Sequence, residues 1–264
     1  MKFTKMQGLG NDYVYIDCFS EQVAKPEELA IRIADRHFGV GGDGLILICP
    51  SEIAPVRMRM FNADGSEGKM CGNGARCVAR YAYDHGLVTS RSFDIETGAG
   101  IRHAEVGESL VTIDMGEAVL DGELEEAITV DGKETRMTPV NVGNPHAVYL
   151  VDGLETLRGL DLDKIGPAYE HHPRFPEGVN SEFLYIESPT ELHMRVYERG
   201  SGETLACGTG ATAVAFAAMR LGRANEKVTV HLLGGDLMLE RLSDGHFRMT
   251  GPAVEVFSGS YFSE

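Results

Sequence analysis

The chain lacks long apolar runs, and no apolar block precedes a cleavage-like site in its first residues. A helix that spans a bilayer needs about 20 consecutive, mostly apolar residues. A secretory signal needs an apolar segment ahead of its cleavage site. The sequence therefore predicts a cytoplasmic protein with neither a membrane segment nor a signal peptide.

Basic residues are also few. The 264 residues include 24 Lys and Arg against 40 Asp and Glu, which gives a formal net charge of −16. Binding to a phosphate backbone depends on clustered positive charge. The composition thus argues against a nucleic acid as partner and favours solubility.

No Cys-x-x-Cys pair occurs among the five cysteines, which are Cys18, Cys49, Cys71, Cys77 and Cys207. Their number is odd and their spacing irregular, so neither a structural zinc site nor any other metal site is expected. In a reducing compartment they remain free thiols. Two lie in apolar, strand-like runs and Cys77 lies in a helical pattern, so Cys18, Cys49 and Cys77 are interpreted as small buried hydrophobes.

The chain contains an internal repeat. A shift of 136 residues, from Cys71 to Cys207, places "CGNGARCVARYA" on "CGTGATAVAFAA", and upstream it places "MRMF" on "MRVY". "GNDYVY" also resembles "GNPHAVY", and "GVGGDGLIL" loosely resembles "GVNSEFLYI". Because these matches occur in the same order, they predict two similar halves.

Short alternating or apolar runs between turn residues predict strands. These strands are expected at 13–19, 45–49, 57–61, 110–115, 146–152, 182–187, 193–198, 227–233, 237–242 and 246–250. Helices are expected at 26–39, 74–86, 154–160, 162–172 and 210–222. The helices after the two Cys-Gly segments are rich in small residues, so each half is predicted to enclose one apolar helix in sheet.

The two Cys-Gly segments begin these helices. Unpaired N–H groups at a helix start favour an anion, so the backbone at Gly72–Asn73 and Gly208–Thr209 is suited to a carboxylate. The same field is expected to lower the pKa of a cysteine placed there. If the two thiols face each other across a ligand, one removes a proton and the other returns one to the opposite face, which inverts a stereocentre.

Several segments together resemble the diaminopimelate epimerase family. They are "GLGNDYVYID", "GVGGDGLI", "FNADGSEGKMCGNGARC", "VGNPHAV", "GVNSEF" and "ERGSGETLACGTGATA". The resemblance runs from residue 3 to about residue 215, and the two segments that contain Cys71 and Cys207 are its most specific parts.

The resemblance implies an α/β (α+β) fold of two pseudo-symmetric halves, each a barrel-like, mostly antiparallel sheet around a central helix. The halves expected are 1–114 plus 254–264 with Cys71, and 115–253 with Cys207. The last strand would return to the first half, and the site would lie between the halves. The resemblance also implies a homodimer that uses no cofactor.

The implied reaction is epimerisation of LL-diaminopimelate to meso-diaminopimelate, in the supply of lysine and peptidoglycan precursors. Cys207 would deprotonate the LL isomer and Cys71 would protonate the opposite face, with His146 and Glu198 assisting. The residues matching substrate-binding positions are Asn11, Asn62, Gly72, Asn73, Asn144, Asn180, Glu198, Arg199, Gly208 and Thr209. Gly44 departs from the pattern, since many relatives have glutamine there.

Three other functions remain open on the sequence. A proline or hydroxyproline racemase would share the paired thiols, although the Asn, Glu and Arg set favours a longer, doubly zwitterionic substrate. A redox protein could use Cys71 and Cys207 as a disulfide pair, and a module could bind amino acids without catalysis. Taken singly, each Asn is also typical of a turn, Glu198 and Arg199 of a solvated pair, and His146 of a satisfied turn histidine.

Overall fold

The computed structural model describes residues 1–262 and divides into two compact units. Unit 1 comprises Met1–Asp114 and the C-terminal segment from Thr250, and unit 2 comprises Met115–Met249. Residues 263 and 264, the end of the predicted first half, lie outside the described residues. None of the helices within 1–262 is long and apolar enough to cross a membrane.

Unit 1 is a mixed sheet with two helices. Its strands are β1 (Lys2–Gly8), β2 (Asn11–Asp17), β3 (Gly44–Cys49), β4 (Val56–Asn62), β5 (Glu67–Gly68), β6 (Ser92–Thr97), β7 (Gly100–Val106), β19 (Val254–Ser260) and the first part of β8 (Leu110–Glu117), whose last three residues belong to unit 2. The helices are α1 (Pro26–Ala34) and α2 (Gly72–Asp84). The strand β1 pairs antiparallel with β2, which pairs parallel with β3. The strand β3 pairs antiparallel with β4, β4 pairs parallel with β6, and β6 pairs antiparallel with β7.

The two helices of unit 1 cover opposite faces of this sheet. Leu45 and Leu47 of β3 pack in one cluster with Leu29 and Ile33 of α1. The intervening Ile46 lies against the first turn of α2. Since β3 is buried on both faces, it is a continuous apolar run rather than an alternating one.

Unit 2 repeats this arrangement. Its strands are β9 (Val119–Leu120), β10 (Glu126–Val130), β11 (Lys133–Asn141), β12 (Pro145–Leu150), β13 (Asn180–Ser188), β14 (Glu191–Glu198), β15 (Gly202–Glu203), β16 (Lys227–Leu232), β17 (Gly235–Arg241) and the first part of β18 (His246–Pro252), whose last three residues belong to unit 1. The helices are α3 (Leu154–Arg158), α4 (Leu162–Glu170) and α5 (Gly208–Arg220). The strands β11, β12, β13, β14, β16 and β17 pair in this order with the same alternation of antiparallel and parallel neighbours as β1, β2, β3, β4, β6 and β7.

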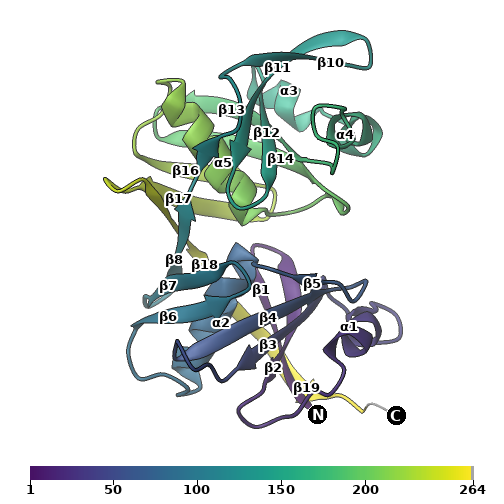
Figure 1. Cartoon of the computed structure of the whole chain (residues 1–264), viewed down its shortest axis with the longest axis vertical. Coiled ribbons are helices and arrows are strands. Elements are labelled where there is room, and N and C mark those ends of the chain that lie inside the picture. The colour runs from purple at the N-terminus through teal and green to yellow at the C-terminus, as the bar shows by residue number, and fades with distance from the viewer. Residues whose placement is uncertain (263–264) are drawn as a thin grey trace. The chain divides into compact units, whose positions relative to one another are not determined.

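The predicted repeat and fold class are confirmed. The helices α2 and α5 have 13 residues each, and α1 and α4 have nine each. In unit 2, α5 contacts six strands, from β11 to β17, so the sheet wraps around an apolar helix; α2 does the same in unit 1. Figure 1 shows these two helices among the strands of their own units.

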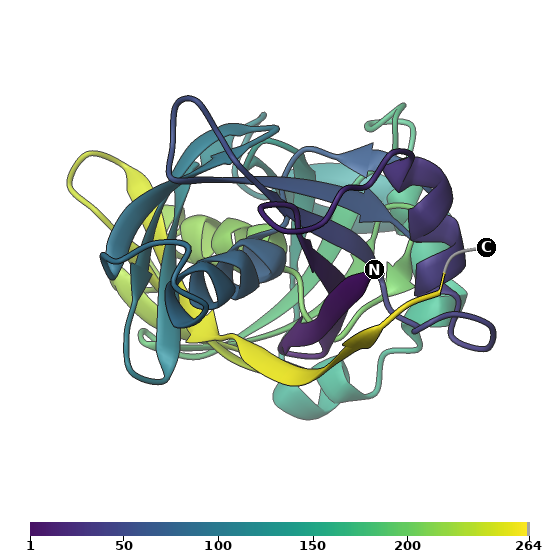
Figure 2. The ribbon, with the colours of Figure 1, turned by 90° about the horizontal axis from the view of Figure 1, so that it is seen from below.

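All five predicted helices and ten predicted strands form, although the helix expected at 26–39 ends at Ala34, and several other strands were not predicted. Those of more than two residues are β1, β6, β7, β10, β11 and β19. Many of their side chains are polar and exposed, so an apolar pattern is weak there. As the resemblance implied, the last strand returns: β19 pairs antiparallel with β1, beside which it runs in Figure 2.

Candidate active site

Cys71 is the N-cap residue of α2, in extended backbone with φ −133° and ψ 117°. Its Sγ accepts the N–H of Gly74 at 3.3 Å and donates to Oδ1 of Asn11, also at 3.3 Å. Asn11 Nδ2 in turn donates to Oδ2 of Asp43 at 2.8 Å. The thiol therefore lies in a hydrogen-bonded chain that joins α2 to the starts of β2 and β3.

Asp43 was not predicted as a site residue. Its Oδ2 also accepts the backbone N–H of Asp12 at 3.0 Å, and its Oδ1 pairs with Arg36 at 3.0 Å. Burial raises the pKa of Asp43, and the charge of Asp12 raises it further against the hydrogen bonds and Arg36. Asp43 fixes the amide of Asn11, so that Oδ1 of Asn11 is turned toward Cys71. Asp43 lies in the segment "GVGGDGLI", which is one of those that resemble the family, but nothing in that segment indicates that its carboxylate binds the amide of Asn11.

Asn73 is buried, and its Oδ1 accepts Nη2 of Arg76 at 2.9 Å. Arg76 is fully buried and also donates Nε to the carbonyl oxygen of Pro252 at 3.1 Å. Burial lowers the pKa of this guanidinium. Asn62, by contrast, is exposed and donates to Ser66 Oγ at 3.0 Å, within its own turn.

Cys207 is the N-cap residue of α5, with φ −122° and ψ 112°. Its Sγ accepts the N–H of Gly210 at 3.3 Å, as Cys71 does from Gly74, and lies 3.5 Å from Oγ1 of Thr209. The two cysteines therefore have the same backbone setting in the two units.

The expectation of a lowered pKa is wrong for Cys207. Burial raises the pKa of this thiol well above its usual range, and the carboxylates of Glu198 and Glu182 raise it further. The hydrogen bonds from Thr209 and the Gly210 N–H act in the opposite direction but are smaller. Desolvation and two nearby negative charges outweigh these two hydrogen bonds, so the free protein holds Cys207 as a neutral thiol.

His146 joins the predicted Asn144 to Glu182, which was not predicted as a site residue. Its Nδ1 lies 2.7 Å from Oε1 of Glu182, and both side chains are completely buried. Its Nε2 lies 3.0 Å from Oδ1 of Asn144. Both ring nitrogens face oxygen atoms, so hydrogen bonds on both sides hold the buried ring.

Glu182 makes the two cysteine sites electrostatically different. An ideal Cβ on Gly210 would lie 2.9 Å from Oε1 of Glu182, whereas one on Gly74 would lie 2.6 Å from Cδ1 of Ile46. The 136-residue shift that carries Cys71 onto Cys207 also carries β3 onto β13, starting with Gly44 on Asn180, and so carries Ile46 onto Glu182. Beside the cysteine turn, the first turn of the helix that each cysteine caps, unit 1 therefore has an apolar side chain and unit 2 a buried carboxyl group. Burial raises the pKa of this carboxyl group.

Three further predicted residues lie at the start of β13 and at or just after the end of β14. Asn180 is buried and donates to the carbonyl oxygen of Pro145 at 2.9 Å, and its Oδ1 accepts the N–H of Arg199 at 3.1 Å. The guanidinium of Arg199 is exposed and donates to the carbonyl oxygen of Glu177 at 3.4 Å. Glu198 accepts a hydrogen bond from Thr204 and acts electrostatically on Cys207.

Gly44 opens β3 in a backbone conformation, φ +156°, that side chains rarely adopt. A Cβ there would lie 2.0 Å from the carbonyl oxygen of Phe61 and 2.9 Å from Cε1 of Tyr13. This backbone therefore leaves no space for the glutamine that many relatives are expected to have.

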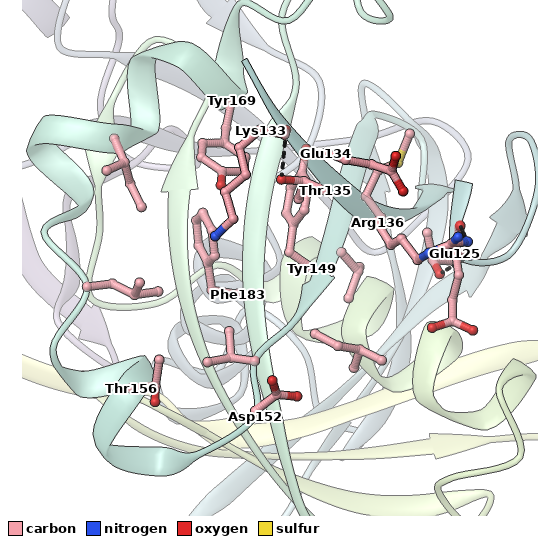
Figure 3. Close-up of a pocket in the computed structure, with 17 residues that line it drawn as sticks. Glu125, Lys133, Glu134, Thr135, Arg136, Tyr149, Asp152, Thr156, Tyr169 and Phe183 are labelled. Atoms are coloured by element: carbon pink, nitrogen blue, oxygen red, sulfur yellow. Dashed lines mark hydrogen bonds between the residues drawn. The ribbon is translucent and has the colours of Figure 1, made fainter. Parts of the chain in front are cut away.

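A separate cavity of about 400 Å³ lies in unit 2, and none of the predicted site residues lines it. Figure 3 shows its aromatic residues Tyr149, Tyr169 and Phe183, whose rings contact one another, beneath polar side chains of β11. In the stretch from residue 1 to 262, no cluster of three or more His, Cys, Asp or Glu side chains could hold a metal ion.

Comparison with protein families gives a match to the model described as diaminopimelate epimerase, over residues 3–120 and 138–256. The chain belongs to the diaminopimelate epimerase family. A relative with that name from Acetivibrio thermocellus is 50% identical over 276 residues, covering 98% of each chain. Another from Geobacillus thermodenitrificans is 51% identical, covering 98% of this chain and 96% of the relative.

Among solved structures, a PhzF-family phenazine biosynthesis protein from Bacillus anthracis has a TM-score of 0.76 at 18% identity, covering 100% of this chain and 99% of the other. A probable proline racemase from Agrobacterium radiobacter has a TM-score of 0.75 at 15% identity, covering 100% and 93%. At such low identity these two likenesses show the fold alone.

Proposed function

We propose that this protein converts LL-diaminopimelate to meso-diaminopimelate, in lysine and peptidoglycan precursor biosynthesis, by proton transfer between substrate and two cysteines. The observation that carries the proposal is the duplicated thiol. Cys71 and Cys207 each cap a 13-residue helix and each accept an N–H at 3.3 Å from the glycine three residues on. Membership of the diaminopimelate epimerase family supports this substrate over proline.

In this mechanism Cys207 removes the α-proton of the LL isomer and Cys71 supplies a proton to the opposite face. The reverse direction exchanges the two roles. The mechanism requires both thiols to reach the same α-carbon. The backbone N–H groups at Gly72–Asn73 and Gly208–Thr209 would bind the α-carboxylate and stabilise the charge that develops beside it.

The raised pKa of Cys207 has a consequence for this mechanism. A neutral thiol is a poor base, so it must lose its proton when substrate binds. The substrate brings an ammonium group, and Glu198 and Glu182 supply the negative charges that raise the thiol pKa. An ammonium beside these carboxylates offsets their charge and favours the thiolate. His146 is hydrogen-bonded to Glu182 and holds that carboxyl group in place.

The proposal also includes a cytoplasmic homodimer that needs no cofactor and no metal. For the dimer, the supporting feature is β19, on which Val254, Val256 and Phe257 are 43%, 55% and 50% exposed. Apolar side chains on an exposed strand are suited to cover by a second copy. A Phe257→Asp variant should sediment as a monomer if β19 forms the interface, and an unchanged dimer would exclude this strand.

The deciding experiment is epimerisation in heavy water. The proposal predicts deuterium at one α-carbon only of the inverted product, together with reduced activity of about a hundredfold or more in each of Cys71→Ser and Cys207→Ser. Cys77→Ala is the matched control, because Cys77 is a fully buried thiol on the same helix as Cys71. Full activity in either serine variant, or faster turnover of proline than of LL-diaminopimelate, would overturn the proposal.

A further inference from the structure

A second pair of cysteines lies side by side at the ends of two strands of unit 1. Cys49 is the last residue of β3, and Cys18 directly follows β2. These strands are parallel, with Asp17 beside Ile48, and the N–H of Cys18 donates to the carbonyl oxygen of Ile48 at 2.8 Å. The register therefore places Cys18 next to Cys49.

Both thiols point to the same face of the sheet. Alternate residues of β2 and β3, ending with Ile16 and Leu47, pack in the cluster under α1. Cys18 and Cys49 lie two residues further along and pack against the margin of that cluster. Both are half-buried rather than enclosed, so the expectation that they are buried hydrophobes is wrong.

The two thiols share a hydrogen bond, and their surroundings differ in charge. The hydrogen bond from Cys18 lowers the pKa of Cys49, against its burial, and the guanidinium groups of Arg59 and Arg57 lower it further. Glu67 opposes them, and Asp17 acts on Cys18. Arg57 lies directly across from Cys49 on β4. A thiolate beside cationic groups at an accessible position is the form that oxidants attack.

We propose that Cys18 and Cys49 are an oxidisable dithiol, which hydrogen peroxide converts into a reversible disulfide between the ends of β2 and β3. The Cys49 thiolate attacks one peroxide oxygen; the O–O bond breaks, and uptake of one proton gives a sulfenic acid and water. The Cys18 sulfur then attacks the Cys49 sulfur, the S–O bond breaks, and the hydroxide leaves as water with the Cys18 proton. The dithiol loses two electrons and peroxide gains them. Two small thiols, such as glutathione, reverse the change and become the oxidised disulfide.

This dithiol is separate from the thiols of the proposed reaction. Asn11, which contacts Cys71, begins β2, and Cys18 follows its end seven residues later. At the rise of an extended strand, the two ends are about 23 Å apart. Oxidation at Cys18 and Cys49 is therefore a different event from any disulfide that Cys71 forms, and it does not depend on the proposed epimerisation.

Peptide mapping of peroxide-treated protein tests the proposal directly. Trypsin cleaves after Arg32 and Arg36, which lie between the two cysteines, so the disulfide joins two peptides that dithiothreitol separates. We expect this linked pair as the main product of mild treatment. The proposal is overturned if both cysteines stay reduced while Cys71 or Cys207 is oxidised. It is also overturned if either becomes a sulfinic acid without linking to the other.

Variants then distinguish the thiol that peroxide oxidises, Cys49, from the thiol that closes the disulfide, Cys18. In Cys18→Ser the sulfenic acid at Cys49 has no partner, so a dimedone adduct should accumulate there, whereas Cys49→Ser should leave Cys18 unmodified. The unmodified protein should also react with iodoacetamide at Cys49 at least about tenfold faster than at the buried Cys77. Cys77→Ala is the matched control and should form the linked peptide at the original rate. Equal dimedone labelling of Cys18 and Cys49 in the two serine variants would refute the assignment of Cys49 as the attacking thiol.

Discussion

Replacing Glu182 with Gln tests whether a buried carboxyl group makes the two cysteine sites chemically different. Gln keeps the size of the side chain and an acceptor oxygen for Nδ1 of His146, but it removes the negative charge. An ideal Cβ on Gly210 lies 2.9 Å from Oε1 of Glu182 and 3.3 Å from Sγ of Cys207. The oxygen and the sulfur are therefore at most about 6 Å apart, and at an effective dielectric of about 20 a carboxylate and a thiolate repel there by roughly 2–3 kcal/mol.

Removing this repulsion should make Cys207 ionise more readily in the free protein. We expect iodoacetamide to alkylate Cys207 at least about tenfold faster at pH 8 in Glu182→Gln, measured on its peptide by mass spectrometry. The variant should also lose about 3 kcal/mol of unfolding free energy in urea, because His146 keeps its buried position but loses its charged partner. The rate of Cys71 should not change, since its own turn lies against Ile46.

Glu187→Gln is the matched control. Glu187 lies on the same strand, β13, and its Oε2 lies 2.5 Å from Nε2 of His193, but its side chain is 54% exposed. Its replacement should cost less than about 1 kcal/mol and leave both thiols unaffected. The reasoning is refuted if Glu182→Gln leaves the alkylation rate of Cys207 unchanged, or if the two variants lose equal stability.

Three further predictions follow from the geometry of the two units. Gly210→Ala should abolish epimerisation and cost about 1–3 kcal/mol, because the new Cβ displaces the Glu182 carboxyl group; an active, equally stable variant would contradict this. Gly44→Gln should unfold at a clearly lower temperature, because its Cβ would meet the Phe61 carbonyl oxygen at 2.0 Å, and an unchanged melting temperature would show that the backbone adapts. Above a pH of about 8.5 the unfolded chain ionises the Cys207 thiol and the folded protein does not, so raising the pH should reduce unfolding free energy by up to about 1.4 kcal/mol per pH unit. Cys207→Ser should remove that part of the slope in urea titrations, and identical slopes would refute the raised pKa.

Much of the fold could be predicted from the sequence because it is written in local patterns. The repeat, the Ala-rich helices that follow Cys71 and Cys207, and the apolar strands need only periodicity and composition. The missed strands show the limit of that signal. In β19 most side chains are exposed, and the strand forms because β1 offers it a pairing edge more than 240 residues earlier in the chain.

The candidate site divides in the same way. The sequence pointed to Cys71, Cys207, His146 and several asparagines, but it gave no sign of what Asp43 and Glu182 hold. Asp43 reaches Asn11 across 32 residues, and Glu182 reaches His146 across 36. Such partners depend on strand register, which one-dimensional patterns do not report.

By itself, the sequence determined that two related halves exist, that each begins its central helix with a cysteine and glycines, and that the chain resembles one family. Only the tertiary structure decided that the two cysteine turns differ, with Ile46 beneath one and Glu182 beneath the other. It also decided that Cys18 and Cys49 are neighbours, since parallel pairing aligned the ends of their strands. The physical reason is that helix and strand patterns are local, whereas the charge and the neighbours of a side chain depend on residues that folding brings from elsewhere in the chain.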